Sequence, residues 1–142
     1  MIKIKEIKIH GLSIPFKKNI QTTWSKRSGT TIFLIELITS NNIKGYGEMI
    51  SFFKSDISKM TLERMVEDIK GFNLFEINKM KNRAIYGGGW MRTGHLNDLG
   101  SAAWAGLETA IYDAICKEKK MPLQDFFGGE IKNDFNKLNV KN

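Results

Sequence analysis

Hydrophobic and polar positions alternate along the first fifty residues of the chain, which predicts β-strands. Over residues 2–16 the alternation changes phase twice, and a β-bulge near Lys5–Glu6 with a bend at Gly11 would reconcile the phases. Apolar, β-branched runs follow at 32–39 and 43–49. We therefore expect a three-stranded antiparallel meander.

The segment 17–31 interrupts this pattern, because it is polar and has no sustained apolar period. We expect it to be a loop between the first two strands. Connections of this length usually cover or bind a ligand.

The next part of the chain has the apolar spacing of helices. The first predicted helix takes Ser58 or Thr61 as its N-cap and stops at Gly71. Asn73 and Glu76 have the spacing of a capping box and predict the start of a second helix. The apolar positions are Leu62, Met65, Val66 and Ile69 in the first helix and Ile77, Met80, Ala84 and Ile85 in the second.

A third helix has the longest apolar stripe, and most of its members are small, which allows a neighbouring element to approach closely. We therefore place it at the buried centre of an α+β domain with about three helices. Pro122 ends this helix. Its stripe consists of Leu99, Ala102, Ala103, Gly106, Leu107, Ala110, Ile111, Ala114 and Ile115.

Length and composition limit the class of protein. The 142 residues suffice for one domain, and 42% hydrophobic residues are typical of a folded chain. No apolar run approaches the ~20 residues of a membrane span, and we expect a cytoplasmic protein. The single cysteine, Cys116, excludes an internal disulfide. The net charge of +7 comes mostly from scattered lysines, so nucleic acid is a disfavoured partner.

Recognisable catalytic motifs are missing from the sequence. His10 and His95 have no neighbour at metal-ligand spacing, and neither glycine cluster completes a nucleotide-binding fingerprint. Four acidic residues could pair as general acid and base, although a carboxylate partnered by a cation or a backbone amide is the simpler interpretation. These residues are Glu36, Glu48, Glu108 and Asp113.

The order of three short motifs carries a resemblance. Gly45-Tyr46-Gly47-Glu48 follows a strand, and Gly106-Leu107-Glu108-Thr109-Ala110-Ile111-Tyr112-Asp113-Ala114 lies in the third helix. Lys117, Pro122-Leu123 and Phe126-Phe127-Gly128-Gly129 follow. This succession resembles the N-terminal domain of the enolase superfamily, in the mandelate racemase and muconate lactonizing enzyme subgroup, although leucines are commoner there than these phenylalanines.

The resemblance implies a capping domain over residues 1–129, with 130–142 as the start of a linker toward a (β/α) barrel. Such a barrel needs ~250 residues, so we expect it to be missing from this chain. The barrel would supply the Mg²⁺ and the Lys or His base that abstracts a proton α to a carboxylate. We therefore expect no catalytic residue, no metal ligand and no cofactor in this chain itself. The full-length parent would be a racemase, dehydratase or cycloisomerase with a small-molecule carboxylate as its substrate. The mixed charged and aromatic character of the cap segments is compatible with sugar acids, dipeptides and aromatic acids alike.

The resemblance also implies that two cap segments, 17–31 and 49–56, close over the substrate. Trp24 and the two phenylalanines offer apolar walls, while Arg27 or Lys54 could pair with an anion. The candidate substrate-binding residues are Trp24, Arg27, Phe52, Phe53 and Lys54.

Two other classes of function remain open. The chain could be a separate protein-interaction or oligomerisation module, or a basic nucleic-acid binder. Without a barrel, one side of the meander and the Phe126-Phe127 tail would be exposed as an apolar surface. We therefore expect self-association and a homo-oligomer.

Overall fold

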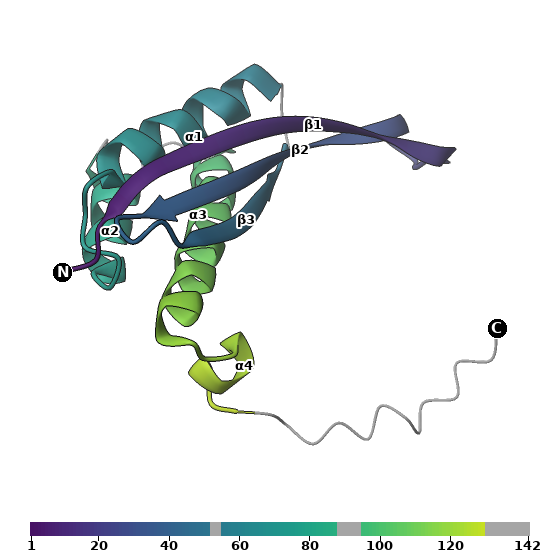
Figure 1. Cartoon of the computed structure of the whole chain (residues 1–142). Helices are drawn as coiled ribbons and strands as arrows, with labels where there is room; N and C mark the ends of the chain where they lie inside the picture. The colour runs from purple at the N-terminus through teal and green to yellow at the C-terminus, as the bar shows by residue number, and fades with distance from the viewer. Residues whose placement is uncertain (52–54, 88–94, 130–142) are drawn as a thin grey trace, which may run out of the picture.

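Three antiparallel strands form the sheet of this protein, in the order β1-β2-β3. The computed structural model describes residues 1–51, 55–87 and 95–129. The strands are β1 (Ile4–Gln21), β2 (Lys26–Thr39) and β3 (Lys44–Ile50), so the predicted meander is confirmed (Figure 1).

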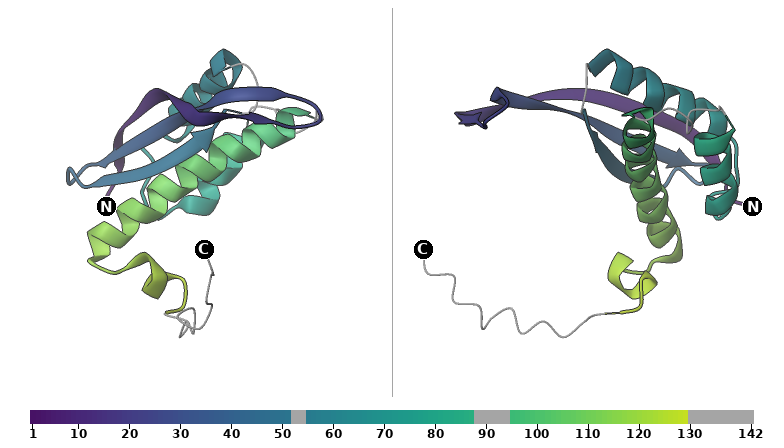
Figure 2. Two further views of the ribbon diagram at one scale, coloured as in Figure 1. Left: turned by 90° about the vertical axis from the view of Figure 1, so that its right-hand side faces the viewer. Right: turned by 180° about the vertical axis from the view of Figure 1, so that it is seen from behind.

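The helices cover one face of this sheet (Figure 2). They are α1 (Ser55–Ile69), α2 (Ile77–Lys81), the π-helical turn η1 (Asn82–Tyr86), α3 (His95–Lys119) and the short α4 (Leu123–Phe126). The predicted α+β class is therefore confirmed. Among the described residues, no helix is long and apolar enough to cross a membrane.

The first two strands are longer than the sequence pattern indicates. The loop expected over 17–31 is wrong: β1 continues to Gln21 and β2 begins at Lys26, so most of this segment is a two-stranded hairpin arm. Figure 1 shows the arm extending beyond the helices. Residues 17–28 of the arm are exposed, so no apolar period marks them as strands.

Two register shifts interrupt the pairing of β1 with β2. The first lies between Ile4 and Glu6, where the sequence predicts a bulge. The second lies between Pro15 and Ile20, whereas Gly11 stays in register opposite Phe33, so the bend expected at Gly11 is not a break in pairing. Pro15 has no backbone N–H to donate, which explains why the ladder loses its register after it.

The two shorter helices differ in detail from the prediction. Ser58 and Thr61 are buried inside α1, and neither is its N-cap. The side chain of Asn73 accepts from the backbone N–H of Phe75 at 3.2 Å, and Glu76 makes no side-chain cap, so the capping box does not form. A π-helical turn then interrupts the predicted second helix at Asn82.

The centre of the domain is the contact between β3 and α3. Ideal Cβ atoms on Gly45 and Gly47 would lie 2.1 Å from the carbonyl oxygens of Ala110 and Gly106, respectively. Only glycine on the strand permits this approach, because any side chain would overlap the helix backbone. Ala110 and Ala114 are fully buried beneath the strand, so the expectation that α3 is the buried centre is confirmed.

Polar side chains of α3 fasten the helix to the free edge of β3. The Asp113 carboxylate accepts from the backbone N–H of Tyr46 at 2.8 Å and from Lys117 Nζ at 2.7 Å. Lys117 Nζ also donates to the carbonyl oxygen of Lys44 at 3.0 Å. These bonds satisfy backbone groups that an edge strand otherwise leaves unpaired.

Candidate functional site

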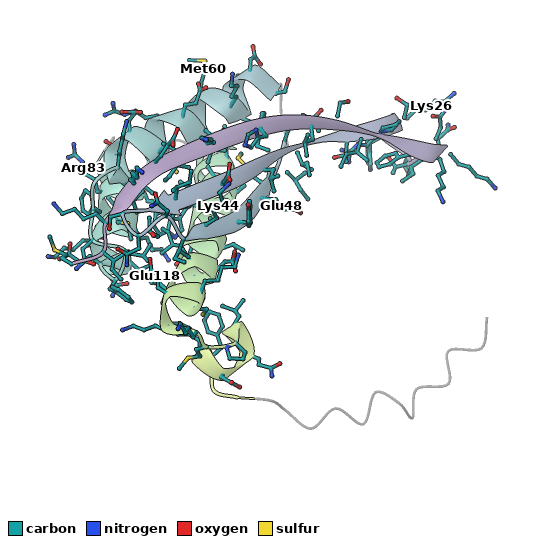
Figure 3. All side chains as sticks on the ribbon, in the orientation of Figure 1. Lys26, Lys44, Glu48, Met60, Arg83 and Glu118 are labelled. Carbon is teal, nitrogen blue, oxygen red and sulfur yellow. The ribbon has the colours of Figure 1, made fainter. Side chains whose placement is uncertain are left out.

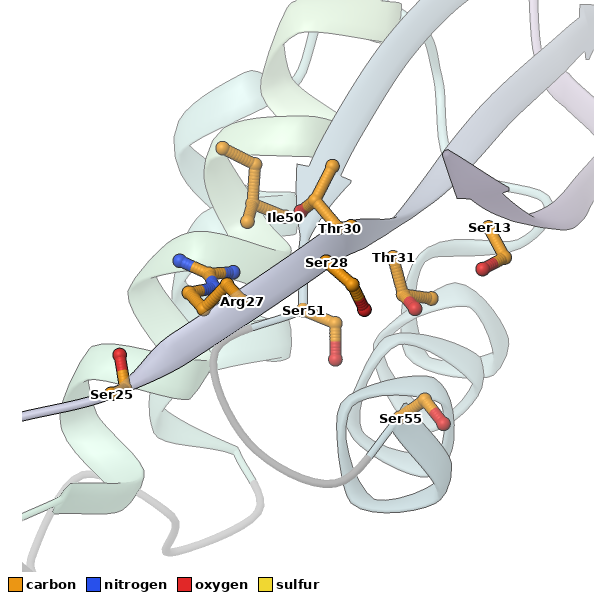
Figure 4. Close-up of a pocket in the computed structure, with 10 residues that line it drawn as sticks. Ser13, Ser25, Arg27, Ser28, Thr30, Thr31, Ile50, Ser51 and Ser55 are labelled. Carbon is orange, nitrogen blue, oxygen red and sulfur yellow. The ribbon is translucent and has the colours of Figure 1, made fainter. Parts of the chain in front are cut away.

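An open groove lies where the hairpin arm meets the end of β3 and the start of α1. Its volume is about 830 Å³, within the range of ligand sites in proteins. Figure 4 shows side chains from several separate segments around it. The lining residues are Ser13, Ser25, Arg27, Ser28, Gly29, Thr30, Thr31, Ile50, Ser51 and Ser55.

Hydroxyl groups dominate the chemistry of this groove. Seven of the ten lining residues are serine or threonine, and Arg27 is the only charged one among them. Arg27 forms no ion pair with any described side chain, so its guanidinium is available to an anion. Hydroxyls both donate and accept hydrogen bonds, and guanidinium binds carboxylate in a two-pronged geometry. The groove therefore suits a ligand that carries both a carboxylate and hydroxyl groups.

The local backbone explains how the arm presents these groups. An ideal Cβ on Gly29 would lie 2.7 Å from the carbonyl oxygen of Ile14, so glycine lets the two strands of the arm approach closely. At the tip, the backbone N–H of Thr22 donates to the carbonyl oxygen of Ser25 at 2.8 Å. The Thr22 hydroxyl in turn accepts from the backbone N–H of Ser25 at 3.1 Å. The arm is therefore an ordered hairpin.

The candidate residues named from the sequence have different positions. Arg27 lines the groove. Trp24 lies at the tip of the arm with 93% of its surface exposed and does not line the groove, so its assignment to substrate stays a prediction. Phe52, Phe53 and Lys54 lie outside the described residues.

The serine and threonine residues of the groove were missed by sequence reasoning. Ser13 and Thr31 are paired across β1 and β2, while Ser55 begins α1 far along the chain. In the sequence each looks like an ordinary solvent-facing position. Only the fold brings them together, and the one available signal was the concentration of Ser and Thr between residues 22 and 31.

A second polar cluster lies around Glu36, on the face of the sheet away from the helices, and the side chain of Glu36 is only 12% exposed. Lys44 Nζ lies 2.6 Å from Glu36 Oε1, and His10 Nε2 lies 3.7 Å from Glu36 Oε2. The hydrogen bond from Lys44 holds the pKa of the Glu36 carboxyl below its ordinary value, and the same bond raises the pKa of Lys44.

Two of the four acidic candidates for catalysis are partnered by other groups. Glu36 is partnered by Lys44, and Asp113 by a backbone amide and Lys117, which is the simpler interpretation given above. Glu48 is exposed on β3. Within the described ranges, no three His, Cys, Asp or Glu residues gather as metal ligands, so this part of the chain does not fit a Mg²⁺ site.

Comparison with known proteins decides the family. The family model described as "Mandelate racemase / muconate lactonizing enzyme, N-terminal domain" matches residues 5–128. The chain belongs to this family. The match covers the meander, the groove and α3, so the resemblance inferred from the three motifs is confirmed.

Several relatives have assigned activities or solved structures. A D-gluconate/D-galactonate dehydratase of Picrophilus torridus is 28% identical over 130 residues, which cover 92% of this chain and 31% of the relative. An L-talarate dehydratase of Polaromonas, solved with Mg and L-glucarate, has a TM-score of 0.79 at 16% identity, covering 92% of this chain and 36% of that one. A mandelate racemase/muconate lactonizing protein of Herpetosiphon aurantiacus has a TM-score of 0.75 at 20% identity, covering 89% and 34%.

These comparisons cover only part of each relative. The chain spans about a third of the length of the proteins that it matches. What it shares with them is an N-terminal domain of enolase-superfamily enzymes.

Proposed function

We propose that this chain is the substrate-capping domain of a Mg²⁺-dependent enolase-superfamily enzyme that abstracts a proton α to the carboxylate of a sugar acid. The observation that carries the proposal is the groove, in which Arg27 stands among seven hydroxyl-bearing residues. The dehydratases of gluconate, galactonate and talarate among the relatives support the same substrate class.

The side chains of this chain can bind a substrate, whereas the chemical step requires groups from the barrel. The groove residues bind and orient the hydroxyl groups at the end of the substrate that is remote from the reacting carbon, with Arg27 donating to oxygen atoms there rather than to the carboxylate at the metal, and closure of the arm over this end excludes water. The metal and the base belong to the barrel that the family resemblance implies. When bound there, Mg²⁺ stabilises the negative charge that develops on the carboxylate.

Hydroxyl groups of the groove favour a sugar acid over an aromatic acid. A polyhydroxylated chain can exchange hydrogen bonds with the hydroxyl groups of the groove once water is displaced, whereas an aromatic ring cannot. Rearrangement, racemisation and elimination all begin with the same proton abstraction, so the cap selects the substrate while the barrel selects the outcome.

Ligand titration followed by NMR tests the proposal directly. D-gluconate should shift the backbone amides of Ser28, Gly29 and Thr31, and mandelate should shift them much less. Arg27→Gln should abolish the response. Lys26→Gln removes a neighbouring charge that does not line the groove, so this control should keep it. Equal responses to both acids, or none at high millimolar D-gluconate, would refute the assignment.

A further inference from the structure

The groove has a charged end and an uncharged end. In Figure 4 the Arg27 side chain lies toward Ser25 and the tip of the arm, whereas Ser55 lies at the other end, at the start of α1. Arg27 is the only charged residue among those that line the groove, and it has no ion-pair partner in the described part of the chain. The groove therefore separates a position for an anion from positions for hydroxyl groups.

The arm around Arg27 has no acidic residue that could occupy this position instead. Between Glu6 and Glu36 the sequence contains lysines and one arginine but no Asp or Glu. Asp56, in the first turn of α1, is not among the lining residues, and its side chain accepts from the backbone N–H of Ile57 at 2.9 Å. An anion beside Arg27 is therefore attracted by the arm and repelled by no lining carboxylate.

Closure of the arm changes what the Arg27 guanidinium requires. In the open groove water solvates the guanidinium, so it needs no partner. Once a substrate displaces this water, a guanidinium without an anion loses hydration that neutral hydroxyl groups restore only in part, because hydrogen bonds to a charged acceptor are stronger. A carboxylate restores it through two parallel hydrogen bonds. The ligand that fits the closed groove best therefore carries an anion at this end.

The reacting carboxylate is not available for this position in the proposed enzyme, because the metal of the barrel holds it. We propose that Arg27 binds a second carboxylate, at the far end of the substrate, and that the substrate is a sugar diacid rather than a sugar monoacid. The inference rests on the proposed function, from which it takes the place of the reacting carboxylate. Arg27 is then the residue that distinguishes the two classes of sugar acid.

Three six-carbon ligands that differ in their ends test this subsite by NMR titration of the chain. D-glucitol has no carboxylate, D-gluconate has one and D-glucarate has two. No barrel competes for a carboxylate here, so either acid can present one to Arg27. D-gluconate should bind at least about tenfold more tightly than D-glucitol. D-glucarate should gain only about a further twofold, because either of its ends can occupy the single subsite.

Two variants with the same change in net charge show whether the preference belongs to Arg27. Arg27→Gln should reduce both acids to the weak binding of D-glucitol. Lys26, at the far end of the arm (Figure 3), does not line the groove, so Lys26→Gln should keep the preference for the acids. Arg27 is exposed and has no described ion-pair partner, so the fold should tolerate its replacement, and circular dichroism checks this.

The possible results separate this subsite from the proposed function. Equal affinity for D-glucitol and D-gluconate would overturn the second carboxylate, while the sugar-binding groove would stand. An increase with each added carboxylate that persists in Arg27→Gln would overturn it too, because it would reflect attraction to the net charge of +7. Tighter binding of D-glucitol 6-phosphate than of D-glucarate would assign the subsite to a phosphate. Mandelate bound through Arg27 as tightly as D-gluconate would instead refute the sugar-acid function and leave the carboxylate subsite.

Discussion

Gly47 of β3 lies directly over the backbone of Gly106 in α3. An ideal Cβ on Gly47 would stand 2.1 Å from the carbonyl oxygen of Gly106, and one on Gly106 would stand 2.8 Å from the carbonyl oxygen of Glu48. Strand and helix therefore meet backbone to backbone. This contact is the physical meaning of the Gly-Tyr-Gly-Glu motif in this chain.

Gly47→Ala should destabilise the domain by about 3 kcal/mol or more, because the added methyl forces strand and helix apart. Urea unfolding measures the change in free energy. The matched control is Gly100→Ala in α3, where the added methyl would meet only the Met65 side chain, at 3.7 Å. That variant should gain about 0.5–1 kcal/mol from helix propensity. Similar costs at both positions would contradict the close contact at Gly47.

Asp113→Ala should cost about 1–2 kcal/mol, because it leaves the Tyr46 amide and the Lys117 ammonium without their acceptor. The side chain is 30% exposed, so water replaces part of the loss. Glu63→Ala breaks an exposed pair with Lys59 on α1 and should change the free energy of unfolding by less than about 0.5 kcal/mol. Equal effects of the two variants in urea unfolding would show that Asp113 does not fasten the edge.

Glu36 should make the domain sensitive to acid. Its pKa is lowered in the folded state, mainly by the hydrogen bond from Lys44, so its contribution to stability is complete above the unfolded pKa of about 4.5. The contribution is lost as the pH falls through the lower folded value. Glu36→Gln should therefore flatten the pH dependence of stability below about pH 4.5.

Thermal unfolding at a series of pH values measures this difference. Glu63→Gln is the matched control, since it removes one carboxylate from an exposed site on α1. If both variants change the pH dependence of stability below about pH 4.5 equally, Glu36 is not the source of the acid sensitivity.

Cys116 should resist thiol reagents in the folded chain. Burial raises the pKa of its thiol, and the negative charge of Asp113 adds to the effect, so little thiolate forms near neutral pH. Labelling by a disulfide reagent at pH 8 should be at least about a hundredfold slower than in the denatured chain. A rate like that of the denatured chain would mean that α3 opens readily.

Those parts of the fold that have one buried face were predictable from the sequence. The strand at 32–39 and the small-residue stripe of α3 have the periods that burial imposes, and both were found. Both faces of the hairpin arm are exposed, so nothing in the order of its residues distinguishes its strands from a polar loop. The break at Asn82 depends on backbone hydrogen bonding that apolar spacing does not encode.

The candidate site was predictable only in part, for a related reason. Arg27 is a candidate from the sequence because the resemblance implies that segment 17–31 covers the substrate and a cation there can pair with an anion, and in the structure it lines the groove. Ser13 and Ser55 come from β1 and α1, and small polar side chains have no pattern of their own. Their convergence depends on long-range pairing, which the sequence alone does not reveal.

The bonds from Asp113 and Lys117 to the edge of β3 have a consequence for how this chain behaves when concentrated. Fibril growth proceeds when a new strand pairs with free backbone groups at the rim of a sheet. The rim at β3 is engaged by α3, and the rim at β1 carries Pro15 and a series of lysines that repel an incoming strand. The chain is therefore protected against templated, amyloid-like elongation at both rims.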